Sequence, residues 1–407
     1  MPFPRHMNGP LHTALADTPV VLIHGARQTG KTTLARMACP DRAYFTLDDA
    51  NLLNAAKNDP VGFVRELPKE VILDEIQRAP ELFPAIKASV DANRRPGRFL
   101  LTGSANLMLL PSLTESLAGR MEVIRLHPLT QAEIHNAPGQ FLHQLLSGNF
   151  SAQPVQPIGR QLTTMLAGGG YPEPVQRQAP ARQRQWHRQY VQAILQRDIR
   201  DVATIRDHGA VEKLLQLLAI RTGQLLNVAE IATGFQFTRP TASAYIDVLR
   251  RLFLVDLLPA WHNNPGNRLI KAPKIHITDT GLAAALMQPG ASDDPDQRAR
   301  QGHLLESFVV QEIQRLAGWT DPELEFFHYR DKDQVEVDLV VTRGHQTWGI
   351  EVKSAATIFP KDFHGLKRLA EQAKPNFQLG IVLYDGELVL PFGPKLWAIP
   401  LAHLWSN

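Results

Sequence analysis

Residues 25–33 contain the residue types that bind phosphate. The run Gly25, Ala26, Arg27, Gln28, Thr29, Gly30, Lys31 and Thr32 fits G-x-x-x-x-G-K-[ST], and Thr33 follows it. Glycines let backbone N–H groups turn towards phosphate oxygens, and the lysine of such a loop reaches the β- and γ-phosphates. A chance glycine turn beside a surface lysine is the alternative. Because the run follows an apolar stretch and precedes a helix start, the sequence predicts a nucleoside triphosphate site, with the Thr32 hydroxyl on Mg²⁺.

Two adjacent carboxylates, Asp74 and Glu75, follow the apolar run 71–73. Such a run predicts a buried strand, and a carboxylate at its carboxyl end can hold the water shell of Mg²⁺. Glu75 would then polarise the attacking water. Two solvated acids at the end of an ordinary strand are the alternative, and the phosphate loop upstream favours the catalytic interpretation.

Three further residues lie near the same expected edge of the sheet. Thr102 ends the run 99–102 and Ser104 follows two residues later; one of them would sense the γ-phosphate, or Ser104 would cap a helix. Arg120 precedes another apolar run and would reach the γ-phosphate of a neighbouring subunit, or pair with a carboxylate on its own surface. Both pairs of alternatives remain open at this point.

Residues 335–341 and 348–354 predict a hairpin that carries charge on one face. With a two-residue type II′ turn at Gly344, paired position numbers sum to 689, so Asp338 faces Glu351 and Glu336 faces Lys353. A divalent cation between Asp338 and Glu351 would relieve their repulsion, Glu306 from a helix over 303–317 would add a ligand, and Lys353 would orient water or stabilise negative charge. An ordinary half-buried hairpin would show the same alternation.

The elements that position these residues fall into three predicted modules. Apolar strands near 20–24, 70–74, 98–102 and 121–126 alternate with helical stretches, which predicts a parallel α/β sheet in 1–135. A Gln- and Pro-rich connection over 136–160 and helical periodicity to residue 258 define a middle module, 136–290. The C-terminal module is 291–407.

The middle module offers two candidate nucleic-acid surfaces. Residues 228–258 predict a helix, a turn, a second helix and a strand, as in a winged helix that contacts DNA or packs against the rest of the chain. Candidate contact residues on the second helix are Arg239, Thr241, Ser243 and Tyr245. The other surface is an arginine-rich stretch with Trp186 and Tyr190 between the basic residues, for which a solvated helix or a subunit contact is the alternative. Its arginines are Arg182, Arg184, Arg188, Arg197, Arg200 and Arg206.

Composition excludes several classes of protein. The 407 residues are 44% hydrophobic and 20% charged, and 43 basic against 40 acidic side chains give a net charge of +3, which excludes a histone-like polyelectrolyte. The single cysteine, Cys39, excludes a disulfide scaffold and a thiolate zinc site. No apolar run approaches the roughly 18 residues that span a bilayer, and the first residues lack an export pattern. We therefore expect a cytoplasmic protein with no membrane contact.

The motifs together resemble a prokaryotic family that joins an AAA-type ATPase domain to a DUF4143-type domain of restriction-nuclease-like fold. The resemblance rests on the phosphate loop, the acidic strand, residues 101–105, residues 116–120, the Gly169-Gly-Tyr-Pro-Glu173 stretch and the Arg197-Asp-Ile199 helix. From the motifs we expect ATP and Mg²⁺ as cofactors and DNA as a partner, with Arg120 acting in trans if the chain forms a ring or a dimer. The resemblance also aligns Glu306, Asp338, Glu351 and Lys353 with a D…E-x-K nuclease core. The alternatives are a non-cleaving ATP-dependent switch and a signalling NTPase that binds protein partners.

Overall fold

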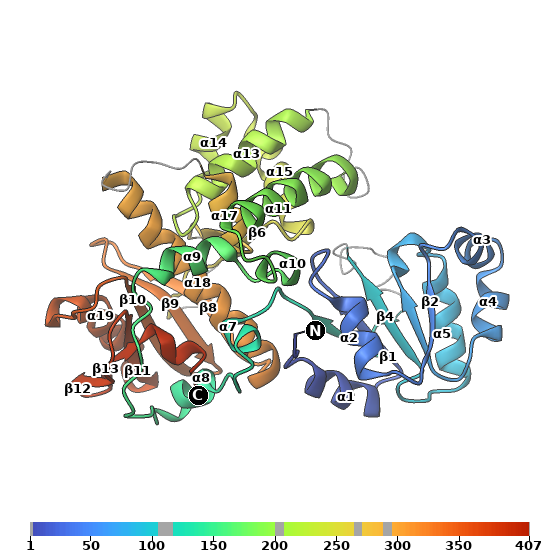
Figure 1. Cartoon of the computed structure of the whole chain (residues 1–407), viewed down its shortest axis with the longest axis horizontal. Coiled ribbons are helices and arrows are strands. Elements are labelled where there is room, and N and C mark those ends of the chain that lie inside the picture. Colours follow the sequence, from blue (N-terminus) through green and yellow to red (C-terminus); the bar gives the residue numbers. More distant parts are fainter. Residues whose placement is uncertain (1–2, 105–116, 200–206, 264–270, 288–294, 407) are drawn as a thin grey trace. The chain divides into compact units, whose positions relative to one another are not determined.

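The structure is a computed structural model that describes residues 3–104, 117–199, 207–263, 271–287 and 295–406. The chain forms two compact units, residues 1–129 with 251–253, and residues 130–250 with 254–407. Figure 1 shows that each unit contains a β-sheet with helices around it. The two units are described separately.

The N-terminal unit is a parallel α/β sheet, as the sequence predicts. Over its described residues five strands lie in the order β2–β3–β4–β1–β5. The strands are β1 Val20–His24, β2 Ala43–Thr46, β3 Val71–Asp74, β4 Phe99–Gly103 and β5 Met121–Arg125. The helices are α1 Asn8–Asp17, α2 Lys31–Ala38, α3 Ala50–Asn58, α4 Pro60–Glu66 and α5 Leu82–Ala92, with the 3₁₀ turn η1 Ile76–Arg78. Strand β2 is missing from the sequence-based prediction because all four of its residues are only half-buried.

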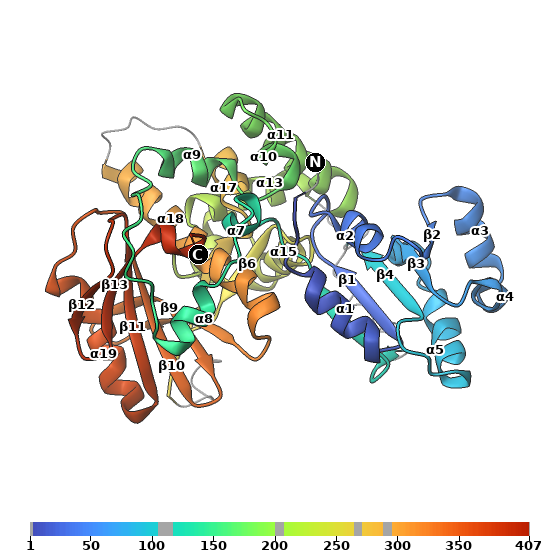
Figure 2. The ribbon, with the colours of Figure 1, turned by 60° about the horizontal axis from the view of Figure 1, so that its bottom comes forward.

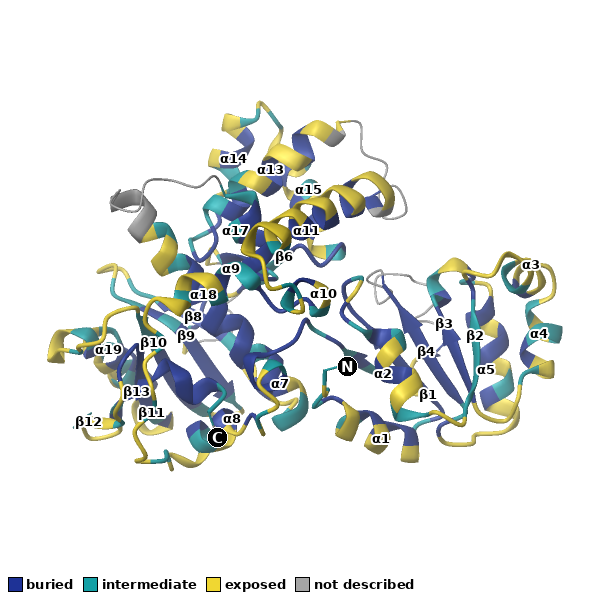
Figure 3. Cartoon of the chain, in the orientation of Figure 1, coloured by how far each residue is buried: buried dark blue, intermediate teal, exposed yellow. Residues whose placement is uncertain are grey.

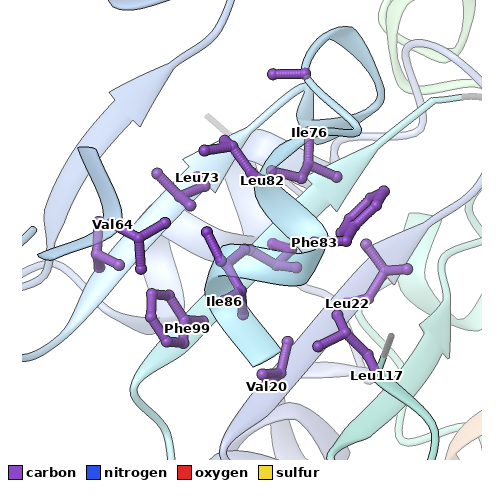
Figure 4. Packing of buried hydrophobic residues seen from close by; sticks show 14 of the residues in the cluster. Val20, Leu22, Val64, Leu73, Ile76, Leu82, Phe83, Ile86, Phe99 and Leu117 are labelled. Atoms are coloured by element: carbon purple, nitrogen blue, oxygen red, sulfur yellow. The ribbon is translucent and has the colours of Figure 1, made fainter. Parts of the chain in front are cut away.

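Burial of apolar side chains between the sheet and α5 holds this unit together. Leu22 of β1 and Leu73 of β3 pack with Phe83 and Ile86 of α5, and each of these side chains is fully buried (Figure 4). Because all strands are parallel and in register, β1, β3 and β4 end at one edge of the sheet. The phosphate loop and Asp74 therefore meet at that edge.

The second unit begins with a predominantly helical part. Its helices are α7 Gln131–Ile134, α8 Phe141–Ser147, α9 Gln161–Gly168, α10 Pro172–Val175, α11 Pro180–Ala193, α13 His208–Ile220, α14 Val228–Gly234, α15 Arg239–Arg251 and α17 Thr280–Leu286, with the π-helical turn η3 Ile194–Asp198. The predicted irregular connection contains α8. The end of this connection is held in place by Asp385, whose carboxylate accepts the N–H groups of Ile158 (2.7 Å) and Gly159 (2.9 Å).

The Gly169-Gly-Tyr-Pro stretch has a structural explanation. Gly169 has φ +65°, and a Cβ there would lie 2.1 Å from Oδ1 of Asp279. The Asp279 carboxylate accepts the N–H groups of Gly170 (2.8 Å) and Gly281 (3.0 Å) and also lies 3.4 Å from the Arg315 guanidinium. This buried aspartate therefore joins the turn after α9 to the start of α17.

The C-terminal part contains a mixed sheet. Over the described residues, six strands lie in the order β12–β13–β11–β10–β9–β8. They are β8 Glu325–Arg330, β9 Glu336–Arg343, β10 Gln346–Lys353, β11 Phe377–Tyr384, β12 Leu390–Gly393 and β13 Leu396–Pro400. The helices are α18 Pro295–Thr320 and α19 His364–Ala373, with 3₁₀ turns η4 Pro360–Phe363, η5 Lys374–Asn376 and η6 Leu401–Leu404. Helix α19 packs against β10 and β11 (Figure 2), while buried residues run along inner strands such as β9 and β11 (Figure 3).

The predicted hairpin is confirmed in its register. Gln346 pairs with Arg343 and Ile350 pairs with Leu339, so the position numbers sum to 689 as expected. Gly344 has φ +58°, the sign that a type II′ turn needs at its first central position. The helix predicted over 303–317 is also confirmed, although α18 begins eight residues earlier.

Within the described ranges, no helix is both long enough and apolar enough to cross a membrane.

Candidate nucleotide site and carboxylate cluster

The phosphate loop turns sharply at both of its glycines. Gly25 has φ +151° and Gly30 has φ +93°, values at which a side chain is strained. A Cβ on Gly25 would also lie 2.3 Å from the carbonyl oxygen of Leu126. Gln28, exposed at the tip, has φ +60°, and the buried Thr29 hydroxyl donates to the Ala26 carbonyl (3.0 Å). The loop is thus folded as a phosphate-binding turn that leads into α2.

Lys31 is folded back onto this loop. Its Nζ donates to the carbonyl oxygens of Gly25 (3.1 Å) and Ala26 (2.8 Å), and the residue is 6% exposed. Burial lowers the pKa of Lys31 to about 8, against the opposing effect of the Glu75 and Asp74 carboxylates. Thr33 is exposed one residue beyond Thr32, and Arg27 is half-buried on the loop.

Asp74 collects three hydroxyl groups at the carboxyl end of β3. Oδ1 accepts from Thr32 (2.8 Å) and from Thr102, and Oδ2 accepts from Tyr44 (2.8 Å). Burial, and then the bond to Asp74, raise the pKa of Tyr44 to about 12. Thr32 and Asp74 are therefore together, as an Mg²⁺ site between phosphate loop and acidic strand requires. The sequence-based prediction did not include Tyr44, because it lies on the unpredicted strand β2.

Glu75 is held beside Ser104 rather than free in solvent. The residue has φ +58°, and its carboxylate accepts from the Ser104 hydroxyl (3.2 Å) and from the Gln77 amide. The same amide donates to the Ser104 oxygen (3.0 Å). Thr102 and Ser104 thus contact Asp74 and Glu75 respectively, and Ala105, Asn106 and Ser116 lie outside the described residues.

The N-terminal segment adds a residue that the sequence did not suggest. Arg5 donates through Nη1 to the Thr29 carbonyl (2.6 Å) and through Nη2 to the His127 carbonyl (2.8 Å). Its guanidinium also lies 3.7 Å from the position that a Cβ on Gly30 would take. Arg5 therefore ties the phosphate loop to the segment after β5, over a sequence distance at which no local motif operates.

Arg120 adopts the second of its two predicted alternatives. Its Nε and Nη2 donate to the two carboxylate oxygens of Asp91, at 2.5 and 3.0 Å. This bidentate hydrogen bond holds the pKa of the Asp91 carboxyl below its ordinary value. To act in trans, Arg120 would have to leave Asp91, so its role as a finger stays a prediction.

The hairpin carboxylates meet a cation that the sequence-based prediction left out, Lys274 of β7 (Lys274–Ile277). Its Nζ lies 2.6 Å from Glu306 Oε1 and 3.7 Å from both Glu336 Oε2 and Asp338 Oδ1. The Lys274 side chain is 3% exposed. Burial alone would lower the pKa of Lys274, but Glu306 and Asp338 outweigh it and the pKa lies above its ordinary value.

The other charged groups of the hairpin are paired differently from the prediction. Glu336 bonds Arg330 on β8 (2.8 Å) rather than Lys353, and Lys353 bonds Glu351 of its own strand (2.8 Å). Asp338 accepts the Val352 N–H (2.9 Å), so the expected proximity of β9 and β10 at this level is retained. The predicted contact of Glu336 with Lys353 is replaced by these two ion pairs, and the β9–β10 pairs of the ladder end at Ile350 and Leu339.

Burial is the largest cause of the raised pKa values of the carboxyl groups in this cluster. It raises the pKa of Glu351 to about 8, with a further contribution from Asp338 and a partial offset by Lys353. It also raises the pKa of Glu306, again with Asp338 adding to the effect. Within the described residues, no three His, Cys, Asp or Glu side chains are arranged to hold one metal ion. Glu306, Asp338 and Glu351 thus converge, but the ammonium group of Lys274 lies among them.

The structure treats the two candidate nucleic-acid surfaces of the middle module differently. Helices α14 and α15 are followed by β6 (Val255–Leu258), which pairs with β7 as an antiparallel ribbon, and Arg239 and Ser243 are exposed on α15. In contrast, Trp186 and Tyr190 are buried and stacked on each other, with Tyr171 against both. The aromatic residues of the arginine-rich helix therefore belong to the core, and a contact of its arginines with nucleic acid stays a prediction. Arg200 and Arg206 lie outside the described residues.

The parallel sheet, the phosphate loop and the acidic strand define an AAA-type P-loop ATPase domain. Three family models match successive parts of the chain: "AAA domain" over residues 17–135, "Domain of unknown function (DUF8612)" over 159–293 and "Domain of unknown function (DUF4143)" over 301–404. The chain thus contains an AAA-type P-loop ATPase domain followed by DUF8612 and DUF4143 domains, which confirms the domain composition that the resemblance implies.

Relatives of nearly full length exist in mycobacteria. The chain is 29% identical over 401 residues to "Uncharacterized protein Rv2008c" of Mycobacterium tuberculosis and to "Uncharacterized protein Mb2031c" of Mycobacterium bovis. In each case the match covers 98% of this chain and 83% of the relative. Among solved structures, the Walker-type ATPase PABY2304 of Pyrococcus abyssi matches 69% of this chain and 95% of its own, with 15% identity and a TM-score of 0.45.

Proposed function

We propose that the chain binds and hydrolyses ATP at the edge of the N-terminal sheet. The observation that carries this proposal is the 2.8 Å hydrogen bond from the Thr32 hydroxyl to Asp74, which brings the phosphate loop and the acidic strand together. Thr32 and Asp74 would hold Mg²⁺, which supplies charge neutralisation for the β- and γ-phosphates. Lys31 leaves the Gly25 and Ala26 carbonyls to bind phosphate oxygens.

Glu75 has the position of the base in this proposal. It follows Asp74 directly and is oriented by Ser104 and Gln77. A carboxylate fixed by two donors can orient and polarise a water molecule without a large reorganisation. Ser104 would then report the presence of the γ-phosphate through its bond to Glu75.

The test is phosphate release by the full chain with Mg²⁺ and ATP. We expect Glu75→Gln to reduce kcat by at least about a hundredfold while keeping the affinity for a fluorescent ATP analogue. Glu81→Gln, an exposed acid six residues away, is the matched control and should leave both quantities unchanged. Hydrolysis at the normal rate in Glu75→Gln would remove Glu75 from this role.

For the C-terminal domain we favour the non-cleaving switch over the nuclease. The restriction-nuclease-like fold and its D…E-x-K residues remain proposals, supported by the mixed sheet and by Glu306, Asp338, Glu351 and Lys353 on adjacent elements. A divalent cation does not fit this cluster well, because Lys274 Nζ already lies within 4 Å of three carboxylates. In this interpretation DNA binds through α15 (Arg239, Ser243), and the ATP state alters that binding.

Two experiments separate the alternatives. Supercoiled plasmid and linear and single-stranded DNA, incubated with Mg²⁺ or Mn²⁺ and with or without ATP, should remain intact. Cleavage that disappears in Glu351→Gln would establish a nuclease instead.

Fluorescence anisotropy with duplex DNA should show binding that weakens with salt and in Arg239→Gln, and that changes in Lys31→Ala. Equal DNA binding by the wild-type chain and Lys31→Ala would refute the coupling, and no DNA binding at any salt concentration would favour a protein partner.

A further inference from the structure

The second unit contains a cavity whose lining residues belong to neither of the sites described above. The cavity has a volume of about 430 Å³, opens to solvent on one side, and is lined mainly by helices α9, α11, α17 and α18. Cavities of about 300–1,000 Å³ are the usual size for small-molecule sites, whereas voids inside a well-packed core are much smaller. This space is therefore large enough for a ligand of drug-like size.

Apolar side chains form most of the cavity wall. Leu166 of α9 and Leu304 and Leu305 of α18 are buried, and Ala284 and Met287 add apolar surface from α17 and the residue after it. Removal of such surface from water favours a ligand with an apolar body, at about 25 cal/mol per Å².

Two guanidinium groups border the same cavity. Arg184 is exposed on α11 and Arg300 is half-buried on α18. The described residues that line the cavity include these two arginines and neither Asp nor Glu. The described wall of the cavity therefore carries positive charge, which favours an anionic group on the ligand.

The cavity is also adjacent in sequence to the carboxylate cluster. Leu305 precedes Glu306, and Ser354, which lines the cavity, follows Lys353. A ligand that contacts Leu305 and Ser354 would thus touch both chain segments that carry the cluster.

We propose that this cavity binds a small amphipathic anion, a molecule with an apolar body and one carboxylate, sulfonate or phosphate group. The apolar body lies against Leu166, Leu304 and Leu305, and the anionic group accepts hydrogen bonds from Arg184 and Arg300.

A pair of fluorescent probes tests the proposal on the full chain. 1-Anilinonaphthalene-8-sulfonate carries an apolar aromatic body and a sulfonate, and N-phenyl-1-naphthylamine carries the same body without the charge. We expect saturable binding of the sulfonate at one site, with at least tenfold higher affinity than the neutral probe. Arg184→Gln and Arg300→Gln should each weaken sulfonate binding about tenfold and leave the neutral probe unchanged, because each removes a charged hydrogen bond.

Two variants verify the location of the probe. Arg182→Gln removes an exposed arginine of α11 that bonds Gln185 instead of lining the cavity, so it should bind the sulfonate normally. Thr163→Phe fills the cavity from an exposed position on α9 and should abolish binding of both probes while the Tm is kept. Equal affinities for the two probes, normal sulfonate binding in both arginine variants or in Thr163→Phe, or no saturable binding would overturn the proposal. Displacement of the sulfonate by a short single-stranded DNA would also overturn it and assign the arginines to nucleic acid.

Discussion

Substitution of Lys274 by Met gives the sharpest test of the carboxylate cluster. The change keeps most of the side-chain volume and removes the ammonium group that lies 2.6 Å from Glu306 and 3.7 Å from Asp338 and Glu336. The Lys274 and Glu306 side chains are 3% and 8% exposed, so solvent screens their attraction little. Removal of one partner from a buried ion pair costs about 3–5 kcal/mol. For a unit of this size, that loss corresponds to a fall in Tm of roughly 6–20 °C.

The effect of Lys274→Met on Tm should also depend on pH. The pKa of Glu306 is already raised by burial and by Asp338, and Lys274 opposes that rise. Without Lys274 the pKa of Glu306 rises further, and the folded variant loses stability as pH increases above about 4.5. Lys274 keeps its charge throughout this range because its pKa lies above the ordinary value. The difference in Tm between the wild-type chain and Lys274→Met should therefore be small near pH 4 and grow towards pH 8.

The assay is intrinsic tryptophan fluorescence during thermal unfolding. All six tryptophans belong to the second unit, so the signal reports on that unit alone. Lys271→Met is the control, since Lys271 is exposed three residues away. Mn²⁺ should raise the Tm of Lys274→Met, because the cation replaces the lost charge, and should leave the wild-type Tm unchanged. A wild-type chain that binds Mn²⁺ tightly and loses it in Asp338→Asn, or a Lys274→Met chain with normal stability at pH 8, would refute the reasoning.

Three further predictions follow from single contacts. Arg5→Gln should weaken binding of a fluorescent ATP analogue about tenfold with little effect on kcat, because Arg5 fixes the Thr29 carbonyl; a normal Kd would contradict this. Gly169→Ala should lower stability by about 2–4 kcal/mol in urea, since its Cβ would lie 2.1 Å from Asp279 Oδ1, and an unchanged urea midpoint would exclude that strain. Glu351 has a pKa raised to about 8, so its ionisation destabilises the fold between about pH 4.5 and 8. Glu351→Gln should flatten the fall in Tm over this range, and a parallel pH profile would show that Glu351 titrates normally.

Features set by short sequence distances were predictable. The phosphate loop, the acidic strand and the turn at Gly344 each depend on residues within about ten positions, where glycine conformations and strand alternation decide the geometry. The length of the two-residue turn fixed the hairpin register. The apolar face agrees with this register, because a one-residue slip would move Val337 and Leu339 to the opposite face of the sheet. The four apolar strands of the first sheet were found for a similar reason.

The residues that the prediction missed act over long sequence distances. Lys274 lies 32 positions before Glu306, and Arg5 lies 122 positions before His127. One signal was present for Lys274: a lysine in the apolar run Lys-Ile-His-Ile predicts a buried charge that needs carboxylate partners. Trp186 and Tyr190 carried another signal, since an i, i+4 spacing places both on one helix face, which here packs against Tyr171.

Helix α18 concentrates the contacts of the second unit on a single rigid element. Its 26 residues extend over about 39 Å. Along its length Leu305 borders the cavity, Glu306 bonds Lys274, Glu312 accepts the Gln131 N–H where the second unit begins, and Arg315 meets Asp279. One helix thus joins the cavity, the carboxylate cluster and the first residues of the second unit. A substitution that shifts α18 should therefore disturb all three of these regions at once.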